Sequence, residues 1–194
     1  MSLPEDHRRI VFLDRDGVIN RDSPHYIKAW TEFEFLPRSL DALRRLTDHG
    51  FETIIITNQS GIGRKFISRE ILADMHRRMK EQIRHNGGDL LDIFYCPHLP
   101  DGGCNCRKPL PGLIKAACRV HDILPDQTVM VGDSAKDIDC AHNAGCGAAV
   151  LVKTGNGIKA QAELRSKNRQ VDYIAEDLYD AVEWIVKRKV PKVS

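Results

Sequence analysis

Two aspartates, Asp14 and Asp16, are the residues of this chain best suited to nucleophilic and acid–base chemistry. They directly follow an apolar run at residues 10–13, which predicts a buried strand. Because side chains two apart in an extended chain point the same way, both carboxylates can face one crevice. One could attack as an anion while the other carries a proton. For so short a motif, a solvated acidic turn is the alternative interpretation.

Further strands and helices must position these aspartates. Apolar runs at residues 53–56, 129–131 and 148–152 are typical of strands buried on both faces of a parallel sheet. Apolar stripes at helical spacing lie between and after them: Leu40, Leu43 and Leu46; Ile71, Leu72, Met75, Met79 and Ile83; Leu113, Ile114, Ala117 and Val120; Leu178, Ala181, Val182 and Ile185. We therefore predict one domain over residues 1–194. Its fold should be α/β, with a doubly wound, Rossmann-like, mostly parallel sheet, helices on both faces and no large cap domain.

Polar side chains end three of the predicted strands, at Asp14, Thr57 and Asp133. Doubly wound sheets bind ligands at the carboxyl ends of their strands. A phosphate dianion about 4 Å from an aspartate is repelled by roughly 8 kcal/mol at an effective dielectric near 20, so such a site needs cations. Asp14 and Asp133 could hold Mg²⁺, and Lys108 could add a further positive charge. The turn at residues 58–61 could add backbone N–H donors.

A second cluster contains three cysteines and a histidine: Cys96, His98, Cys104 and Cys106. These ligand types suit a closed tetrahedral Zn²⁺ site of the structural kind. The segment 96–106 is rich in proline and glycine and has little apolar mass, so a metal would stabilise a loop that cannot pack itself. Unrelated cysteines and a redox switch are the alternatives. We predict a zinc-stapled loop that fixes the adjacent Lys108.

Composition narrows the classes of partner. The chain has 194 residues, a net charge of +2 and 6% aromatic residues, which argues against a zinc-stabilised module that binds nucleic acid. No segment is apolar and long enough to cross a bilayer, and the polar residues 1–9 lack the apolar stretch of a secretory signal. Clustered metal-ligating cysteines fit a reducing compartment. We therefore expect a cytoplasmic monomer that binds a small molecule and neither nucleic acid nor membrane.

Four segments resemble, in order, the motifs of the haloacid dehalogenase (HAD) superfamily. They are Asp14-Arg15-Asp16-Gly17-Val18, Thr57-Asn58-Gln59-Ser60-Gly61, Lys108-Pro109 and Gly132-Asp133-Ser134-Ala135-Lys136-Asp137. The resemblance spans most of the chain and is far more specific than any single motif. It implies a Mg²⁺-dependent phosphatase that hydrolyses a phosphate monoester.

The resemblance also implies roles for individual residues. Asp14 would carry the phosphoryl group as an aspartyl phosphate, and Asp16 would be the general acid and then the general base. Mg²⁺ would be held by Asp14, the backbone carbonyl of Asp16 and Asp133, and Asp137 would orient this site from outside the ligand set. The transferring phosphoryl group would be stabilised by Thr57 and Lys108.

Two groups within the superfamily are similar to this chain: the heptose 1,7-bisphosphate 7-phosphatases and the histidinol-phosphate phosphatases. Residues 20–26, 58–62 and 152–155 resemble the first group. The five residues between His98 and Cys104 resemble the second, and Ser134 departs from the lysine possible in the first. We give the first group more weight. A third alternative is a nucleic-acid 3′-phosphatase, but this sequence shows no extended run of basic residues that could bind a polyanion. The implied substrate contacts are Asp22, Tyr26, Asn58, Gln59, Ser60 and Arg107.

Overall fold

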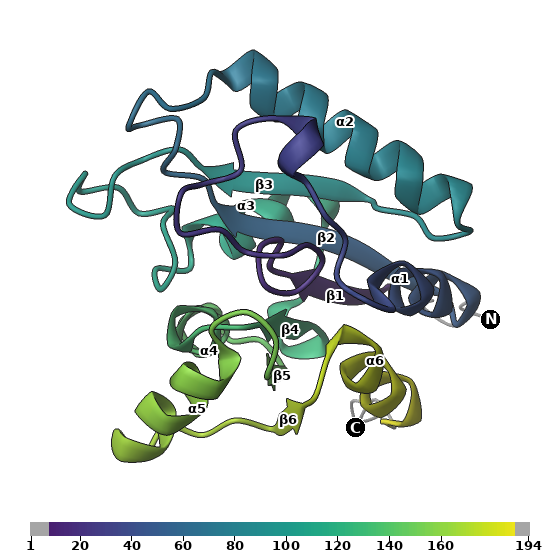
Figure 1. The fold of residues 1–194 in the computed structure, drawn as a ribbon. Helices are drawn as coiled ribbons and strands as arrows, with labels where there is room; N and C mark the ends of the chain where they lie inside the picture. Colours follow the sequence, from purple (N-terminus) through teal and green to yellow (C-terminus); the bar gives the residue numbers. More distant parts are fainter. Residues whose placement is uncertain (1–7, 189–194) are drawn as a thin grey trace.

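The computed structural model describes residues 8–188 and contains a six-stranded, all-parallel sheet in the order β3-β2-β1-β4-β5-β6 (Figure 1). The strands are β1 (Arg9–Leu13), β2 (Phe51–Asn58), β3 (Asp92–Cys96), β4 (Val129–Gly132), β5 (Ala148–Val152) and β6 (Tyr173–Ala175). The strand order reverses between β1 and β4, which creates the crevice where such sheets bind ligands. The predicted doubly wound α/β fold is confirmed. The predicted domain limits, and most of the polar start at residues 1–9, extend beyond the described residues.

Helices cover both faces of the sheet. One face packs against α1 (Ser39–Asp48), α2 (Arg69–His85) and α6 (Leu178–Lys187), and the other against α3 (Gly112–His121), α4 (Ala135–Ala144) and α5 (Gly157–Ser166). Successive residues of a strand point to opposite faces of the sheet, and each face has its own hydrophobic core. In β1, Val11 and Leu13 lie in the core beneath α1, α2 and α6, while Ile10 and Phe12 lie in the core beneath α3, α4 and α5. Short 3-10 helices occupy Trp30–Glu32 and Pro125–Gln127.

Most residues of the predicted helical stripes are buried; Leu40 in α1 is only partly buried, and two other residues are exposed. Ile71 in α2 is 44% exposed and Val120 in α3 is 63% exposed. Both lie at the edge of their stripe, and in α2 the buried face includes His76 instead. The hydroxyl of Ser68 caps α2 by accepting a hydrogen bond from the Ile71 N–H at 3.2 Å.

The connections that border the crevice contain no separate cap within the described residues. Residues 14–38 and 59–68 link strands to helices with only the short 3-10 helix at Trp30–Glu32. The site is therefore formed by loops at the carboxyl ends of the strands.

Of the helices in residues 8–188, none has the length and apolar character that a membrane span requires.

Candidate active site

Asp14 lies at the point where the strand order reverses. Leu13 pairs with Val131 of β4, and the N–H of Asp14 donates to the carbonyl of Val131 at 2.9 Å, so Asp14 ends β1 beside the end of β4. Its side chain is largely buried, and Oδ2 lies 2.8 Å from Nζ of Lys108. Burial raises the pKa of Asp14 well above its ordinary value, and although Lys108 opposes this, the charges of Asp137 and Asp133 add to it.

Three carboxylates meet at this point: Asp14, Asp133 and Asp137, with ligand oxygens within 4.8 Å of one another. Burial and the neighbouring Asp137 raise the pKa of Asp133 to about 7. Asp137 is already engaged, because Oδ1 lies 2.6 Å from Nζ of Lys108 and Oδ2 accepts from the N–H and hydroxyl of Ser134 at 3.0 and 2.6 Å. Three buried acids around one lysine carry excess negative charge, and this donor set fits a divalent cation.

Two glycines make room for the Asp133 carboxylate. Gly17 follows β1 with φ +79°, and Gly155 follows β5 with φ +56°. A Cβ atom on either residue would overlap Oδ2 of Asp133. The same oxygen accepts a hydrogen bond from the N–H of Asn156 at 2.8 Å, so the loops after β1 and β5 both close on this carboxylate.

Asp16 is held differently from Asp14. Its oxygens accept hydrogen bonds from Arg15, from Asn20 at 2.8 Å and from Gln59 at 2.9 Å. Burial opposes ionisation of Asp16, but the charge of Arg15 and these hydrogen bonds outweigh it and lower its pKa. The amide of Gln59 also donates to Oγ1 of Thr57 at 3.0 Å, which links the second motif to the first.

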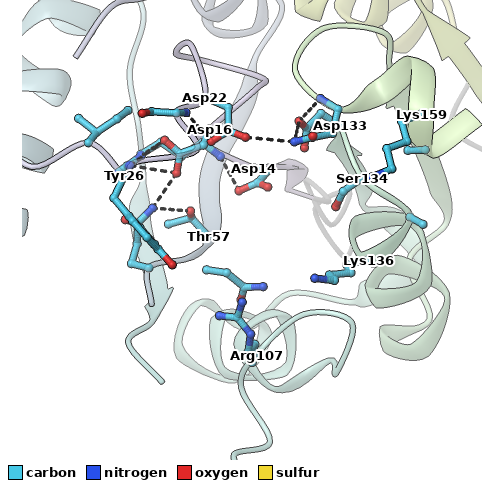
Figure 2. Close-up of a pocket in the computed structure, with 18 of the residues that line it drawn as sticks. Asp14, Asp16, Asp22, Tyr26, Thr57, Arg107, Asp133, Ser134, Lys136 and Lys159 are labelled. Carbon is cyan, nitrogen blue, oxygen red and sulfur yellow. Dashed lines mark hydrogen bonds and ion pairs between the residues drawn. The ribbon is translucent and has the colours of Figure 1, made fainter. Parts of the chain in front are cut away.

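A cleft of about 420 Å³ opens above these carboxylates. Figure 2 shows Asp14 between Asp16 and Asp133, with Arg107, Lys136 and Lys159 around the same opening. The lining also includes predicted substrate contacts: Asp22, Tyr26, Asn58, Gln59 and Arg107. Ser60 is buried and outside this lining, and its substrate contact stays a prediction.

Several lining residues carried no predicted role. Lys136, Lys159, Ser134 and Asn156 all border the cleft. Lys136 and Ser134 stand inside the fourth motif, where the start of α4 beside the Asp133 strand end could have indicated them. Lys159 lies in α5, a helix for which no stripe was predicted, and its position depends on how α5 folds back to the crevice.

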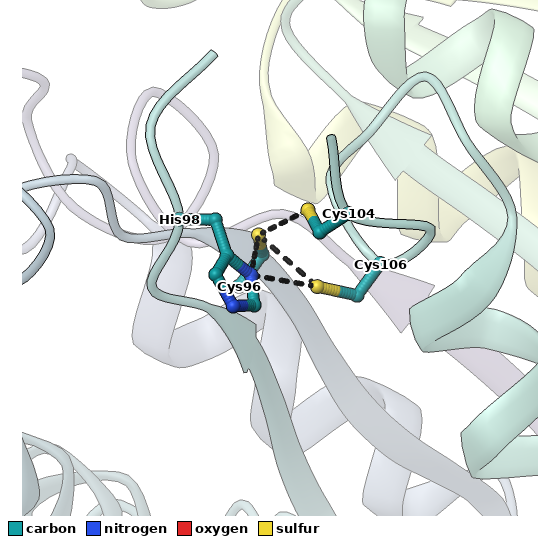
Figure 3. Close-up of side chains that lie close together, drawn as sticks. All are labelled: Cys96, His98, Cys104 and Cys106. Carbon is teal, nitrogen blue, oxygen red and sulfur yellow. Dashed lines mark hydrogen bonds between the residues drawn. The ribbon is translucent and has the colours of Figure 1, made fainter. Parts of the chain in front are cut away.

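The predicted zinc ligands form one cluster (Figure 3). The Sγ atom of Cys96 lies 3.5 Å from Nδ1 of His98, 3.6 Å from Sγ of Cys104 and 3.2 Å from Sγ of Cys106. Nδ1 of His98 lies 3.3 Å from Sγ of Cys106. Ligands about 2.0–2.3 Å from a tetrahedral Zn²⁺ would lie roughly 3.5–3.8 Å apart, so two of these four separations fall in that range and two are shorter, while the donor types suit this ion.

Comparisons with known proteins agree with this site. A family model described as HAD-hydrolase-like matches residues 105–181. The D-glycero-beta-D-manno-heptose-1,7-bisphosphate 7-phosphatase of Pseudomonas aeruginosa is 42% identical over 152 residues, covering 78% of this chain and 85% of that protein. The D-glycero-D-manno-heptose-1,7-bisphosphate 7-phosphatase of Thermosynechococcus vestitus is 40% identical and covers 95% of this chain and 99% of its own length.

A solved structure agrees as well. The D,D-heptose 1,7-bisphosphate phosphatase of B. bronchiseptica, crystallised in complex with magnesium and phosphate, superposes with a TM-score of 0.86 at 38% identity. The match covers 92% of this chain and 98% of that one. The chain therefore belongs to the HAD-type phosphatase family of the heptose 1,7-bisphosphate 7-phosphatases; its four motifs predicted the superfamily, and residues 20–26, 58–62 and 152–155 predicted the group.

Proposed function

We propose that this enzyme removes the 7-phosphate of D-glycero-D-manno-heptose 1,7-bisphosphate. The observation that carries the proposal is the position of Asp14, a buried carboxylate 2.8 Å from the Lys108 ammonium at the floor of a cleft bordered by further cations. The names of the relatives support the heptose bisphosphate. The short spacing between His98 and Cys104 is the feature that favours histidinol phosphate, the second candidate.

The reaction follows from the two aspartates of the first motif. Asp14 attacks phosphorus, the bond to the leaving sugar oxygen breaks, and Asp16 gives that oxygen its proton; the negative charge of the bound phosphate favours the protonated acid over the ionised form that Arg15 stabilises in the free site. Water then attacks the aspartyl phosphate, Asp16 takes the proton from this water, and inorganic phosphate leaves with Asp14 regenerated. Lys108 and the hydroxyl of Thr57 stabilise the transferring phosphoryl group.

Mg²⁺ would be held by Asp14, Asp133 and the backbone carbonyl of Asp16. The buried acids fit this ion, and the related phosphatase of B. bronchiseptica was crystallised with magnesium and phosphate. Bound Mg²⁺ supplies positive charge that offsets the repulsion between phosphate and carboxylate. Asp137 would orient the ligands from behind through Lys108 and Ser134.

Zn²⁺ would staple the loop of residues 96–106. The loop leads directly into Arg107 and Lys108, so a structural metal would fix the cation that faces Asp14. We expect zinc to copurify with the reduced protein at one ion per chain, measured by elemental analysis. Protein that is folded and active without zinc would overturn this site.

The substrate is tested by specificity constants. We expect kcat/KM to favour heptose 1,7-bisphosphate, in one or both anomers, over histidinol phosphate, with Asp14→Asn as the inactive control. A preference for histidinol phosphate above about tenfold, roughly 1.4 kcal/mol in transition-state binding, would overturn the heptose assignment.

A reducing compartment suits the six free cysteines, so we place the enzyme in the cytoplasm. We expect a monomer by size-exclusion chromatography.

A further inference from the structure

Arg15 lies between the two catalytic aspartates, yet its side chain is only 2% exposed. A guanidinium that leaves water needs partners for its charge and for its N–H groups. Asp16 supplies the charge, because Nη2 of Arg15 donates to its two oxygens at 2.7 and 2.9 Å and Nε donates to Oδ1 at 3.2 Å. The guanidinium therefore binds both carboxylate oxygens of Asp16 from the buried side, in a forked arrangement, while Asp16 itself borders the cleft.

His76 holds the opposite edge of the same guanidinium. Nη1 of Arg15 lies 3.3 Å from Nε2 of His76, and because an arginine N–H can only donate, Nε2 must accept. His76 is buried on α2 and packs edge-on against the ring of Tyr95. Burial, and then the charge of Arg15, lower the pKa of His76 to about 3, so the ring stays neutral and keeps its acceptor at neutral pH.

The ring of Phe33 and the sulfur of Met75 also lie near the guanidinium, with the Phe33 centroid 5.8 Å from Cζ of Arg15. Sδ of Met75 lies 3.8 Å from Nη1, a long contact to a weak acceptor. Sulfur therefore adds packing, whereas the nitrogen of His76 fixes the rotation of the guanidinium plane. The fork on Asp16 can keep its direction only while that plane is fixed.

We propose that Arg15 and His76 act together as positioning residues that aim the carboxylate of Asp16 at the leaving oxygen of the substrate. This inference rests on the proposed phosphatase function and deepens it. The chain of contacts runs from α2 through His76 to Arg15 and from there to Asp16. Asn20 and Gln59 complete the hold, so that Asp16 accepts five hydrogen bonds in all.

A positioning role for Arg15 and His76 predicts a kinetic effect that a purely structural role does not. A proton donor matters most when the leaving oxygen is a strong base and little when the leaving group departs readily as an anion. Misplacing Asp16 should therefore slow hydrolysis of alkyl phosphates more than hydrolysis of activated aryl phosphates. The dependence of kcat/KM on the basicity of the leaving group should become steeper, because kcat/KM reports the step in which the leaving group departs, whereas water attack on the aspartyl phosphate is common to every ester.

The test is a series of alkyl and aryl phosphates measured on full-length enzyme. In His76→Leu, which removes the acceptor, we expect kcat/KM to fall roughly tenfold or more for alkyl esters and less than about threefold for the most activated aryl ester. His76→Gln, which keeps an acceptor at a similar reach, should recover most of the loss. Met75→Leu, which removes only the sulfur, should match the unaltered enzyme. Arg15→Lys keeps the charge but loses the fork, and it should show the same steepened dependence.

Two results overturn the positioning role. One is an equal loss on all esters in folded His76→Leu and Arg15→Lys, which indicates a structural contribution alone. The other is unaltered activity of both variants on every ester. If His76→Leu does not fold, Arg15→Lys and His76→Gln still decide the question. Absence of turnover on every ester by the unaltered enzyme would instead remove the proposed phosphatase function.

Discussion

The side-chain amide of Asn58 and the main chain of Lys108 form a reciprocal pair of hydrogen bonds. The N–H of Lys108 donates to Oδ1 of Asn58 at 3.1 Å, and Nδ2 of Asn58 donates to the carbonyl of Lys108 at 3.2 Å. Nζ of the same lysine donates to the carbonyl of Ile56 at 2.8 Å. The end of β2 therefore fixes the cation that faces Asp14. Asn58 borders the cleft, but its amide is engaged with Lys108, and its predicted contact with substrate stays a prediction.

Asn58→Ala should displace Lys108 and leave two main-chain groups without their partners. We expect kcat on an aryl phosphate to fall roughly tenfold or more, and the free energy of unfolding in urea to fall by about 1–3 kcal/mol. Asn143→Ala is the matched control, because Nδ2 of Asn143 donates to the carbonyl of the adjacent Pro109 at 3.0 Å from an exposed position. Asn58→Ala with unaltered kcat would show that Lys108 is positioned by other contacts.

His76 makes stability depend on pH. Its pKa is lowered from an ordinary value near 6.5 to about 3 in the folded protein, mainly by burial. Below pH 6.5 the unfolded chain therefore binds a proton that the folded chain does not, so this residue's contribution is complete above pH 6.5 and is lost as the pH falls toward 3.

Urea unfolding of the unaltered protein and of His76→Gln isolates this effect, because the other titrating groups are common to both. Between pH 6 and 4 the unaltered protein should lose up to about 1.4 kcal/mol per pH unit relative to the variant. A difference that stays constant across this range would contradict the neutral, buried state of His76.

Cys104→Ala removes one of the four proposed zinc ligands. We expect the zinc content to fall and the free energy of unfolding to drop by more than about 2 kcal/mol, since metal binding contributes directly to folding. The kcat on an aryl phosphate should fall too, because the loop carries Lys108. Cys146→Ala, which changes a cysteine outside the cluster, is the control. Equal effects of the two substitutions would argue against a metal at Cys104.

Arg107 borders the cleft away from the reacting carboxylates, where a second phosphate would lie. Arg107→Ala should lower kcat/KM for the bisphosphate by about 1.5–3 kcal/mol, the usual contribution of a charge-assisted hydrogen bond. The same change should affect a small aryl phosphate much less. Arg119→Ala, an exposed arginine on α3, is the control for net charge. Equal losses on the two substrates would place Arg107 at the reacting phosphate instead.

The sequence alone predicted the parts of the fold that are most deeply buried. Strands β1, β2, β4 and β5 each contain an apolar run because helices cover both of their faces, and parallel pairing brings Asp14, Thr57 and Asp133 to one edge. The edge strands β3 and β6 were not predicted, and both are more exposed than the central strands; the apolar run at residues 93–96 in β3 enters the sequence prediction only through Cys96, the first residue of the zinc loop. Strand β6 is also only three residues long.

The residues that hold the site residues in place could not be predicted from local sequence patterns. His76 reaches Arg15 across 61 residues of sequence, and Asn156 reaches Asp133 across 23. Neither contact leaves a periodic signal, because each depends on how one loop or helix packs against another element. The proposed nucleophile and the proposed metal ligands, in contrast, follow strands or stand close together in one loop.

The central claim is that Asp14 is the nucleophile, and release of phosphate by Asp14→Asn tests it most directly. The asparagine keeps the shape of the side chain but loses the attacking charge. With Mg²⁺ and heptose 1,7-bisphosphate, purified Asp14→Asn with the circular dichroism spectrum of the unaltered enzyme should release no phosphate above the uncatalysed rate. Appreciable turnover by this folded variant would contradict the assignment.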